Sequence, residues 1–551
     1  MAEATVEPRL RRAVGPWGSY SWGYADVGAD IYVALGLVLA AAEGFSNIAF
    51  LFAGLIYVTV GLAYTELAAM YPIAGGGQLF VARGLGDFWG FVAGWAVLLD
   101  FTIDIALFAL FSAGYFDHFF PGLSRPPWII LEALAIVLFL LGLNIIGVRE
   151  SSRLNEVASA LDIATETSLI FIGFFFAFDP AFYWHQFSAF AMHFDTSKLL
   201  FGTSLAIISF VGLESIAQAS QETERPTTIV PRTSVALILT ILAYALALSN
   251  LALGVIPWQS YDPNSTTIAC QGLSHGACAA AHLAHQNAPV AWLAIHLPVV
   301  GAFVAPVIAV LGTLLLLISS NAGVYGSSRI MYSMAGNGLA PGIFTRVSAR
   351  FRTPVISLVV FCAIAIGELI FSGLTPDAAN TLGDMYAFGA ASSYTLVFVS
   401  LLVLRYTDQD TPRTFRVPWN VRVHWRDVPF ELPIVGVLGL MGISSVLLMV
   451  FLTHPIGRVA GPTWLILGLI GYMIYRKRQT RPVLHSIRHD WPEKQLAVYE
   501  ESGETALAEE YREALKRRAR KSQAVIPPEI LQTPGEAKPQ PTPDTTLSGR
   551  H

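Results

Sequence analysis

The stretch that decides the fold is YADVGADIYVALGLVLAAA, residues 24–42. It is apolar over most of its length, but Gly28 and two acidic residues, Asp26 and Asp30, interrupt its first half. As a helix, about 20 predominantly apolar residues cross the roughly 30 Å hydrocarbon core of a bilayer. The stretch therefore predicts a first membrane span at 26–42, with a weak point near Gly28.

Apolar segments of this length recur along the chain. Of its 551 residues, 54% are hydrophobic and 13% are charged, whereas about 25% are charged in an average soluble domain. No basic tract with a short apolar region and a small-residue cleavage site is present, so we expect no signal peptide. We predict an all-α membrane protein with about twelve spans, at 26–42, 47–69, 88–114, 128–147, 156–178, 199–220, 233–256, 290–323, 354–373, 382–404, 433–453 and 460–475.

The distribution of Lys and Arg predicts the orientation. With the N-terminus placed in the cytoplasm, 17 of the 34 Lys and Arg residues fall in inner segments, 3 fall in outer segments and 14 lie from Arg476 onward. Cytoplasmic loops carry such an excess of basic residues. We therefore expect a multi-pass protein of a bacterial-type inner (plasma) membrane, with both termini cytoplasmic.

The composition divides the chain into four parts. Residues 1–23 form a short polar lead, and residues 24–475 form the membrane domain. Residues 476–524 are charged, and Glu500 to Lys521 is predicted as one solvated helix. Residues 525–551 are rich in Pro and Thr and are predicted to be disordered.

The largest outer loop, about 257–289, contains Cys270 and Cys278. A disulfide between them is one reading, because the outer face is oxidising. A metal site formed by Cys278, His282 and His285 is the alternative, and nothing else in the sequence calls for a metal.

Motifs of ATP-driven pumps and zinc hydrolases are absent from the sequence. It holds no G-x-x-x-x-G-K-[ST] phosphate loop and no H-E-x-x-H motif. We therefore expect no enzyme activity, no cofactor and no nucleic-acid partner, and we leave the oligomeric state open.

Two of the predicted spans are interrupted in the same way. Span 1 contains Asp26 to Tyr32 and span 6 contains Phe210 to Glu214, and each joins glycine to acidic residues. Transporters often bind substrate where a helix unwinds near the middle of the membrane. The two places correspond in spans 1–5 and 6–10, and an odd number of spans inverts the second half, so an inverted repeat over about 24–178 and 199–406 is predicted. The alternative is that these glycines only allow close helix packing.

Acidic residues also occur within other spans. Asp100 and Asp104 in span 3 lie four residues apart on one helix face, and Asp162 and Glu166 repeat this spacing in span 5. Carboxylates in a bilayer are costly and usually face a pathway or a partner. The spans contain no Lys or Arg near their centres. A proton relay or a cation site is predicted, and a neutral acid hydrogen-bonded between helices is the alternative.

Five motifs carry a resemblance to a known family. They are Val27-Gly28-Ala29-Asp30-Ile31-Tyr32; Tyr64-Thr65-Glu66-Leu67 with Tyr71-Pro72 and Gly75-Gly76-Gly77; Phe210-Val211-Gly212-Leu213-Glu214 with Glu222, Pro226 and Ile229-Val230-Pro231-Arg232; Arg329 to Ala335 with Asn337 to Pro341 and Arg352-Thr353-Pro354; and Phe415-Arg416-Val417-Pro418. In this order they resemble the amino acid–polyamine–organocation permeases over most of residues 24–420, with the fourth motif in the loop after span 8.

The resemblance implies a LeuT-type fold, a five-plus-five inverted repeat with two extra helices, which works by alternating access with proton or sodium coupling. It implies a substrate site in spans 1 and 6, where amides of Gly28, Ala29 and Ile31 face a substrate carboxylate, carbonyls of Phe210 to Leu213 face an amine, and Phe210 serves as a gate. The residues expected to contact substrate are Val27, Gly28, Ala29, Asp30, Ile31, Phe210, Val211, Gly212 and Leu213. Those expected to bind the coupling ion or proton are Asp26, Asp30, Asp100, Asp104, Glu214, Ser319 and Ser320.

Asp30 departs from the family pattern, which has a second glycine there. A carboxylate beside a substrate carboxylate repels it by about 4 kcal/mol at 4 Å and an effective dielectric near 20. Asp30 therefore points away or is protonated, pairs with a cationic amine, or helps bind a metal cation.

Tyr24-Ala25-Asp26-Val27-Gly28 also resembles the first span of potassium uptake proteins of the same superfamily. Our main prediction is a permease for an amino acid or related amine. The alternatives are an inorganic cation transporter on the same fold and a non-transporting membrane sensor or partner subunit.

Overall fold

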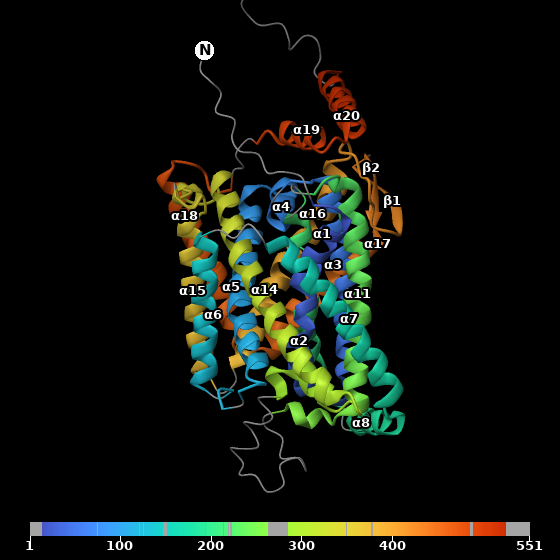
Figure 1. Ribbon diagram of the computed structural model, residues 1–551. Coiled ribbons are helices and arrows are strands. Elements are labelled where there is room, and N and C mark those ends of the chain that lie inside the picture. The colour runs from blue at the N-terminus through green and yellow to red at the C-terminus, as the bar shows by residue number, and fades with distance from the viewer. Residues whose placement is uncertain are drawn as a thin grey trace, which may run out of the picture.

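The protein is a bundle of long helices with a small hairpin and two further helices at one end (Figure 1). The computed structural model describes residues 14–73, 75–120, 122–124, 126–146, 151–192, 194–212, 214–218, 220, 223–262, 285–348, 350–375, 378–426, 428–484 and 489–524. The predicted disorder of 525–551 and both readings of Cys270, Cys278 and His282 lie outside these residues.

The elements follow one another in a long helical series. The α-helices are α1 Pro16–Val27, α2 Ile31–Ala42, α3 Ser46–Met70, α4 Gly76–Leu85, α5 Asp87–Phe116, α6 Trp128–Ile146, α7 Ser151–Phe176, α8 Pro180–Met192, α9 Thr196–Ala206, α10 Glu214–Gln218, α11 Pro226–Val255, α13 Pro289–Ile295, α14 Gly301–Gly336, α15 Val355–Gly373, α16 Ala378–Thr407, α17 Ile434–Thr453, α18 Gly457–Arg478, α19 Trp491–Glu501 and α20 Thr505–Ala524. Short 3₁₀ turns are η1 Gly28–Asp30, η2 Glu43–Phe45, η3 Ile207–Phe210, η5 Trp258–Tyr261 and η7 Gly342–Thr345. The strands are β1 Asn420–Trp425 and β2 Val428–Pro433.

Eleven helical segments of the described chain are long and apolar enough to cross a membrane. The first, Pro16–Met70, takes in both of the first two predicted spans, which meet at η2. Glu43 in that turn has a φ of 53°, so the chain reverses there between α2 and α3. The prediction of a multi-span helical membrane protein is confirmed.

Two predicted span boundaries are wrong. The first helix begins at Pro16, because the small and polar residues after it, including Ser19 and Ser21, are buried against other helices and so escape a hydropathy profile. The segment 290–323 divides into α13 and α14, and α14 continues to Gly336 through residues predicted as a loop. Within this extension the Arg329 guanidinium lies 3.6 Å from the centre of the Tyr325 ring. Hydropathy therefore marks the apolar part of a helix and not its ends.

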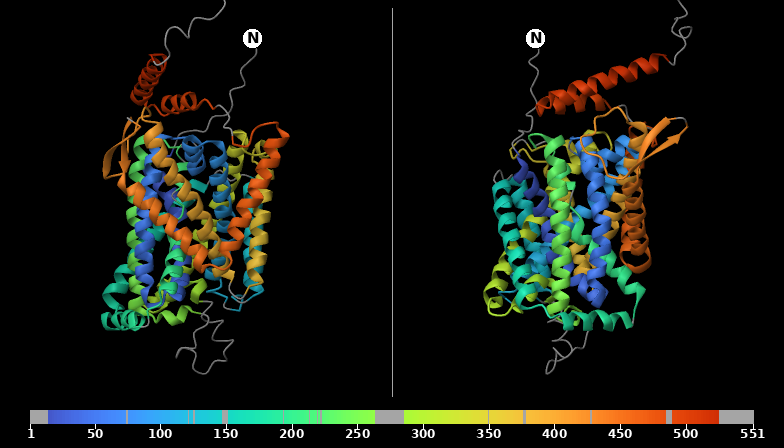
Figure 2. Two further views of the ribbon diagram at one scale, coloured as in Figure 1. Left: turned by 180° about the vertical axis from the view of Figure 1, so that it is seen from behind. Right: turned by 90° about the vertical axis from the view of Figure 1, so that its right-hand side faces the viewer.

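The helix α5 lies at the centre of the bundle and packs against α14 and α16 (Figures 1 and 2). Glycines allow these close contacts. A Cβ on Gly323 of α14 would lie 3.0 Å from Asp104 Cβ, and one on Gly389 of α16 would lie 3.2 Å from the Asp100 amide nitrogen. The acidic face of α5 is therefore buried between α14 and α16.

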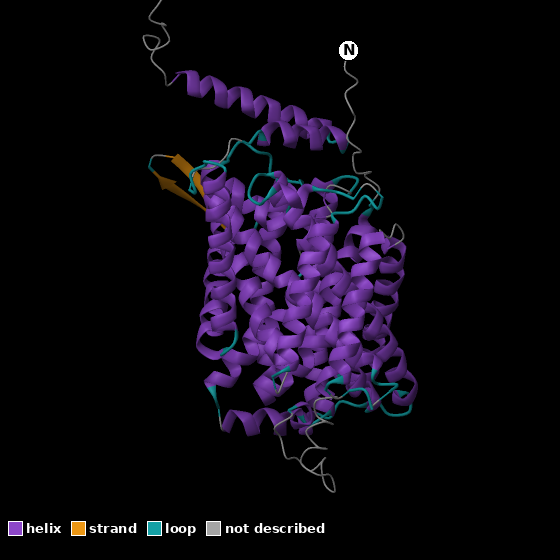
Figure 3. Ribbon diagram, turned by 90° about the vertical axis from the view of Figure 1, so that its left-hand side faces the viewer, coloured by secondary structure: helices purple, strands orange, loops and turns teal. Residues whose placement is uncertain are grey.

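The C-terminal helices lie across one end of the bundle, which we call the tail face (Figure 3). The solvated helix predicted at 500–521 corresponds to α20, most of whose described side chains are exposed, but it begins at Thr505, because a turn in which Gly503 has a φ of 72° separates it from α19. The helix α19 is docked on the bundle rather than solvated. Tyr499 is fully buried, and Gln495 accepts a bond from Arg83 Nη1 at 2.6 Å and donates one to the Met70 carbonyl.

The two strands are the one departure from an all-helical fold among the described residues. They pair antiparallel, with Arg422 opposite Glu431 and Trp425 opposite Val428. The hairpin joins the end of α16 to the start of α17 and lies at the tail face (Figure 1).

Candidate functional site

The sixth predicted span is broken near its middle. After η3, Val211 is extended (φ −93°, ψ 152°) and Gly212 has a φ of 115°, and α10 then begins at Glu214. Only glycine adopts this φ without strain. A Cβ on Gly212 would also lie 2.9 Å from Asp26 Oδ2, so position 212 requires glycine for conformation and for space.

The first span is tightened rather than opened. Its residues 27–31 keep right-handed helical angles through η1, and the Gly28 amide donates to the Tyr24 carbonyl. The Gly28 amide is therefore already bonded in this conformation, and its contact with a substrate carboxylate stays a prediction. A 3₁₀ turn pairs backbone groups three residues apart in place of four, so it tightens the helix while its backbone groups remain hydrogen-bonded. A Cβ on Gly28 would lie 2.8 Å from the Tyr24 ring, which accounts for a glycine in this turn.

The two interruptions meet at Asp26. Ser215 of α10 donates a hydrogen bond to the Asp26 carboxylate, and Ser319 of α14 donates to the Asp26 carbonyl at 3.0 Å. Ser320 donates instead to the Ile105 carbonyl of α5 at 2.9 Å. Asp26 thus ties the first span to the sixth and to α14, while Ser320 joins α14 to α5.

Three further predicted acids come together around one tyrosine. Asp30 of η1 and Asp100 and Asp104 of α5 all act electrostatically on the buried Tyr386 of α16. In the described part of the chain, every basic side chain that is less than a tenth exposed lies in the last turn of a helix or after one: Arg83, Arg405, Arg413, His454 and Arg476. No three His, Cys, Asp or Glu side chains among the described residues are placed to hold a metal ion. The centre of the bundle is therefore acidic.

A second buried acidic pair lies beside the first span. Tyr24 donates to Asp162 Oδ2 at 2.8 Å and lies 3.0 Å from Glu166 Oε2, and Tyr32 donates to Asp162 Oδ1 at 2.6 Å. The two tyrosines stand four residues before and after Gly28. The sequence showed the spacing of the acids, and this symmetric placement of tyrosines was the signal for their partners.

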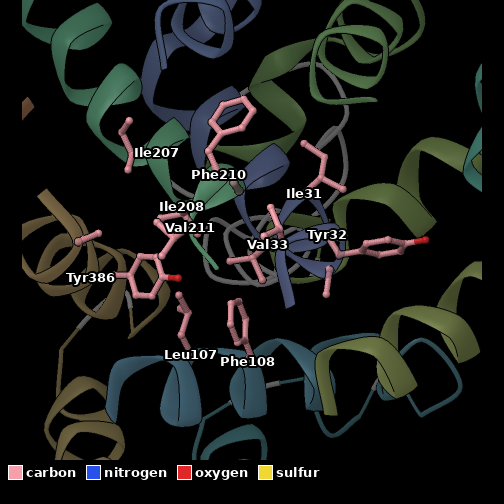
Figure 4. Close-up of a cluster of buried hydrophobic side chains, with 14 of the residues drawn as sticks. Ile31, Tyr32, Val33, Leu107, Phe108, Ile207, Ile208, Phe210, Val211 and Tyr386 are labelled. Carbon is pink, nitrogen blue, oxygen red and sulfur yellow. The ribbon is translucent and has the colours of Figure 1, made fainter. Parts of the chain in front are cut away.

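Apolar side chains close the centre. Phe210, 2% exposed, stacks on Tyr57 with ring centroids 5.0 Å apart. Figure 4 shows Val211 from the break facing Leu107 and Tyr386. Val27 and Ala29 are also buried. The predicted substrate residues are thus brought together but are packed against one another.

Two predicted positions are not described in full. Leu213 lies outside the described residues, and only the backbone of Glu214 is described, as the first residue of α10. Their predicted roles stay predictions.

A family model for amino acid permeases matches residues 22–475. The chain belongs to the amino acid permease family. The match takes in both interruptions, the acidic centre and all eleven apolar segments apart from the ends of the first and last.

Characterised relatives of this permease differ in their substrates. It is 24% identical over 499 residues to the branched-chain amino acid permease BcaP of Bacillus subtilis, covering 87% of this chain and 96% of the relative. It is 29% identical over 434 residues to cationic amino acid transporter 4 of Mus musculus, covering 75% of this chain but only 62% of that longer protein. It is 22% identical over 473 residues to the methylthioribose transporter of Bacillus subtilis, covering 82% and 91%.

Proposed function

We propose that this protein carries an amino acid or related amine across a bacterial-type plasma membrane by alternating access, coupled to protons or a cation. We also propose that the tail face and both termini are cytoplasmic, because the predicted inner segments carry the excess of arginine. The observation that carries the proposal is the contact between the two interrupted spans, where Ser215 of α10 donates a hydrogen bond to the Asp26 carboxylate.

The break at Val211 and Gly212 supports a binding role for the sixth span. An extended residue followed by a left-handed one takes the backbone out of the helix, and carbonyls at such a break are the groups that transporters turn toward a substrate. In the present conformation the Gly212 carbonyl accepts a hydrogen bond from the Ser215 amide at 3.0 Å, so this bond must open when Gly212 binds a substrate amine. The amides near Gly28 must be released from their helical bonds to face the substrate carboxylate. In this proposal, opening of η1 and movement of Phe210 away from Tyr57 accompany substrate binding.

The charge of the centre favours a positively charged substrate. A carboxylate and an ammonium group 4 Å apart attract by about 4 kcal/mol at an effective dielectric near 20. Asp30, Asp100 and Asp104 all lie close enough to Tyr386 to interact with it electrostatically. We therefore propose a cationic amino acid or amine as the preferred substrate, with Asp30 facing its second amine.

A count of hydrogens supports proton coupling through Asp162 and Glu166. The Tyr24 hydroxyl has one hydrogen, yet oxygens of both carboxyl groups lie within hydrogen-bonding distance. If the Tyr24 hydroxyl donates its hydrogen to Asp162, its contact with Glu166 is a hydrogen bond only when Glu166 is protonated and donates to the Tyr24 oxygen. The groups that face the pair from neighbouring helices are tyrosines: Tyr20, Tyr24, Tyr32, Tyr115 and Tyr244.

Uptake by purified protein in proteoliposomes tests the proposal. Radiolabelled arginine, lysine, leucine and putrescine are supplied with and without an inward proton gradient, and protein-free vesicles serve as the control. We expect saturable uptake of at least one cationic solute, stimulated by the gradient. Binding without uptake would contradict the proposal and favour a sensor.

The second candidate is an inorganic cation transporter, which the carboxylates near Tyr386 favour. Measuring rubidium uptake into the same proteoliposomes distinguishes the two candidate functions. Rubidium uptake that no amino acid or amine inhibits would replace the amino acid proposal with this candidate.

A further inference from the structure

An arginine-rich cavity of about 390 Å³ lies at the tail face, between the end of α16 and the β1–β2 hairpin. Its lining residues are Arg405, Gln409, Arg413, Arg416, Arg422, Pro429, Phe430 and Glu431. Four guanidinium groups and one carboxylate therefore face this space. None of them belongs to the acidic centre described above. We call this space the arginine pocket.

Acidic partners balance only part of this charge. The fully buried Glu66 of α3 lies 2.6 Å from Arg405 Nη2 and 3.6 Å from Arg413 Nε. Glu431 lies 2.8 Å from Arg416 Nη1 and opposite Arg422 across the hairpin. Two carboxylates thus pair with four guanidinium groups, which leaves an excess of about two positive charges.

Neighbouring groups do not remove this excess of positive charge. The Asp408 carboxylate also acts on Arg413, but it lies 3.7 Å from Arg83 Nη2, so this pair adds no net charge. Arg413 also donates to the carbonyls of Leu404 and Asp408, which are neutral acceptors. Burial lowers the pKa of Arg413 from its ordinary value, as expected for a charge removed from water. An adjoining cavity adds Asp410 and Glu510 but also Arg517 and Arg518, so its added charges cancel.

The hairpin beside the pocket carries an exposed apolar surface. Side chains alternate along a strand, so Val421, Val423 and Trp425 lie on one face of β1 and Arg422 on the other. Trp425 is 60% exposed and Val421 is 47% exposed, and Trp419 just before the strand is 71% exposed. Tryptophan is enriched where membrane proteins meet the lipid headgroups. The apolar segment α17 follows β2 directly, so the hairpin lies at the boundary of a membrane span.

We propose that the arginine pocket binds the phosphate group of an anionic phospholipid, with the exposed hairpin residues resting at the headgroup level of the same leaflet. Arginine suits this role because its planar fork of donors matches phosphate oxygens in a bidentate way. The inference rests on the membrane orientation given under the proposed function and is independent of the transported solute.

The bound phosphate has a structural consequence. It balances the charge next to the buried pair of Glu66 and Arg405, which joins α3 to α16. Because α3 follows the first interrupted span, an anionic lipid at this pocket stabilises the contact between the two parts of the bundle at the tail face.

Native mass spectrometry of the full-length protein tests the proposal without any transport assay. The protein in detergent is titrated with phosphatidylglycerol or phosphatidylcholine of the same acyl chains, and in separate arms with inorganic phosphate as a competitor. Each arginine near a membrane surface contributes about fivefold to the binding of an anionic lipid, so Arg416→Gln with Arg422→Gln should weaken phosphatidylglycerol binding roughly 30-fold.

The matched control is Arg346→Gln with Arg350→Gln, a pair of exposed arginines away from the pocket. We expect it to bind phosphatidylglycerol like the natural chain. Arg416→Lys with Arg422→Lys, which keeps the charge but not the bidentate donors, should fall between the two and confirm that the pocket variants are folded. Equal binding of the two lipids by the natural chain, or an equal loss in the control pair, would overturn the proposal. So would full displacement of phosphatidylglycerol by millimolar inorganic phosphate, which would make this a site for a free anion.

Discussion

The turn at residues 28–30 and the break at residues 211–212 occur in the same kind of sequence, an apolar helix in which a glycine stands two residues before an acid, Asp30 or Glu214. In the first, the helix tightens by one 3₁₀ turn and keeps its backbone bonds. In the second, the described backbone leaves the helix at Val211 and Gly212. The comparison shows that glycine permits an opening, whereas the surrounding contacts decide whether the opening occurs.

The contacts around the two places differ in a definite way. Tyr24 and Tyr32 are both held by Asp162, so the residues on either side of Gly28 are fixed to the same carboxyl group and the turn stays closed. Around Gly212, Phe210 is held by Tyr57 and Ser215 is held by Asp26, which lie on different elements. The ends of the break are thus held by different parts of the bundle, which keeps it open.

The largest effect is expected at Gly212. In Gly212→Ala the left-handed φ and a Cβ 2.9 Å from both Asp26 and Val27 together cost about 3 kcal/mol, so substrate uptake should fall roughly 100-fold. Gly28→Ala has an ordinary φ and meets only the Tyr24 ring, so its loss should be smaller. The control is Gly367→Ala, where nothing lies within 4 Å. Uptake in proteoliposomes measures all three, and an equal loss at positions 28 and 212 would contradict the comparison.

The next largest effect is expected from removing the hydrogen bond between Ser215 and Asp26, which joins the two spans. A hydrogen bond to a carboxylate contributes about 2 kcal/mol, so Ser215→Ala should lower substrate affinity or stability by roughly 30-fold in equilibrium constant. In a double-mutant cycle with Asp26→Asn, thermal unfolding should show a coupling energy of at least about 1 kcal/mol. Additive losses would mean that Ser215 and Asp26 do not hold the interruptions together. Ser328→Ala, which removes a hydroxyl bonded only within α14, is the matched control.

Variants of Asp30 test whether the negative charge in the turn at residues 28–30 selects cationic substrates. Asp30→Asn removes one of several nearby carboxylates, so binding of arginine and lysine should weaken about tenfold while leucine binding changes by less than about twofold. Thermal-shift titrations of the purified protein measure both. Asp30→Gly restores the residue typical of the family and should have the same selective effect. Unchanged selectivity in both variants would remove Asp30 from substrate recognition.

The smallest effect on stability, and a specific effect on coupling, is expected at Glu166. In Glu166→Gln an amide replaces the proposed carboxylic acid and still donates to Tyr24, so stability should change by less than about 1 kcal/mol. Uptake should lose its stimulation by an inward proton gradient, while exchange of substrate across the membrane persists. The pH profile of uptake by the variant and the natural chain measures this. A variant that remains stimulated by the gradient would separate this pair from proton coupling.

Much of the fold could be predicted from composition alone. Membrane spans, the family and the interruption at Gly212 depend on local properties, because hydropathy and the conformational freedom of glycine belong to short stretches of chain. The presence of acids in the centre is equally local. The sequence did not predict the start of α1, the extension of α14 or the docking of α19. Burial of polar residues such as Gln495 depends on partners that are distant in the chain.

The sequence by itself determined that this chain is a multi-span permease with two interrupted helices and several acids within its spans. Only the tertiary structure decided which interruption opens, which tyrosines hold Asp162 and Glu166, and that four arginines line one pocket together with one carboxylate. The physical reason is that each of these features joins residues far apart in the chain, as Tyr24 and Glu166 are. Their energies arise from distance and desolvation, which exist only once the helices have packed.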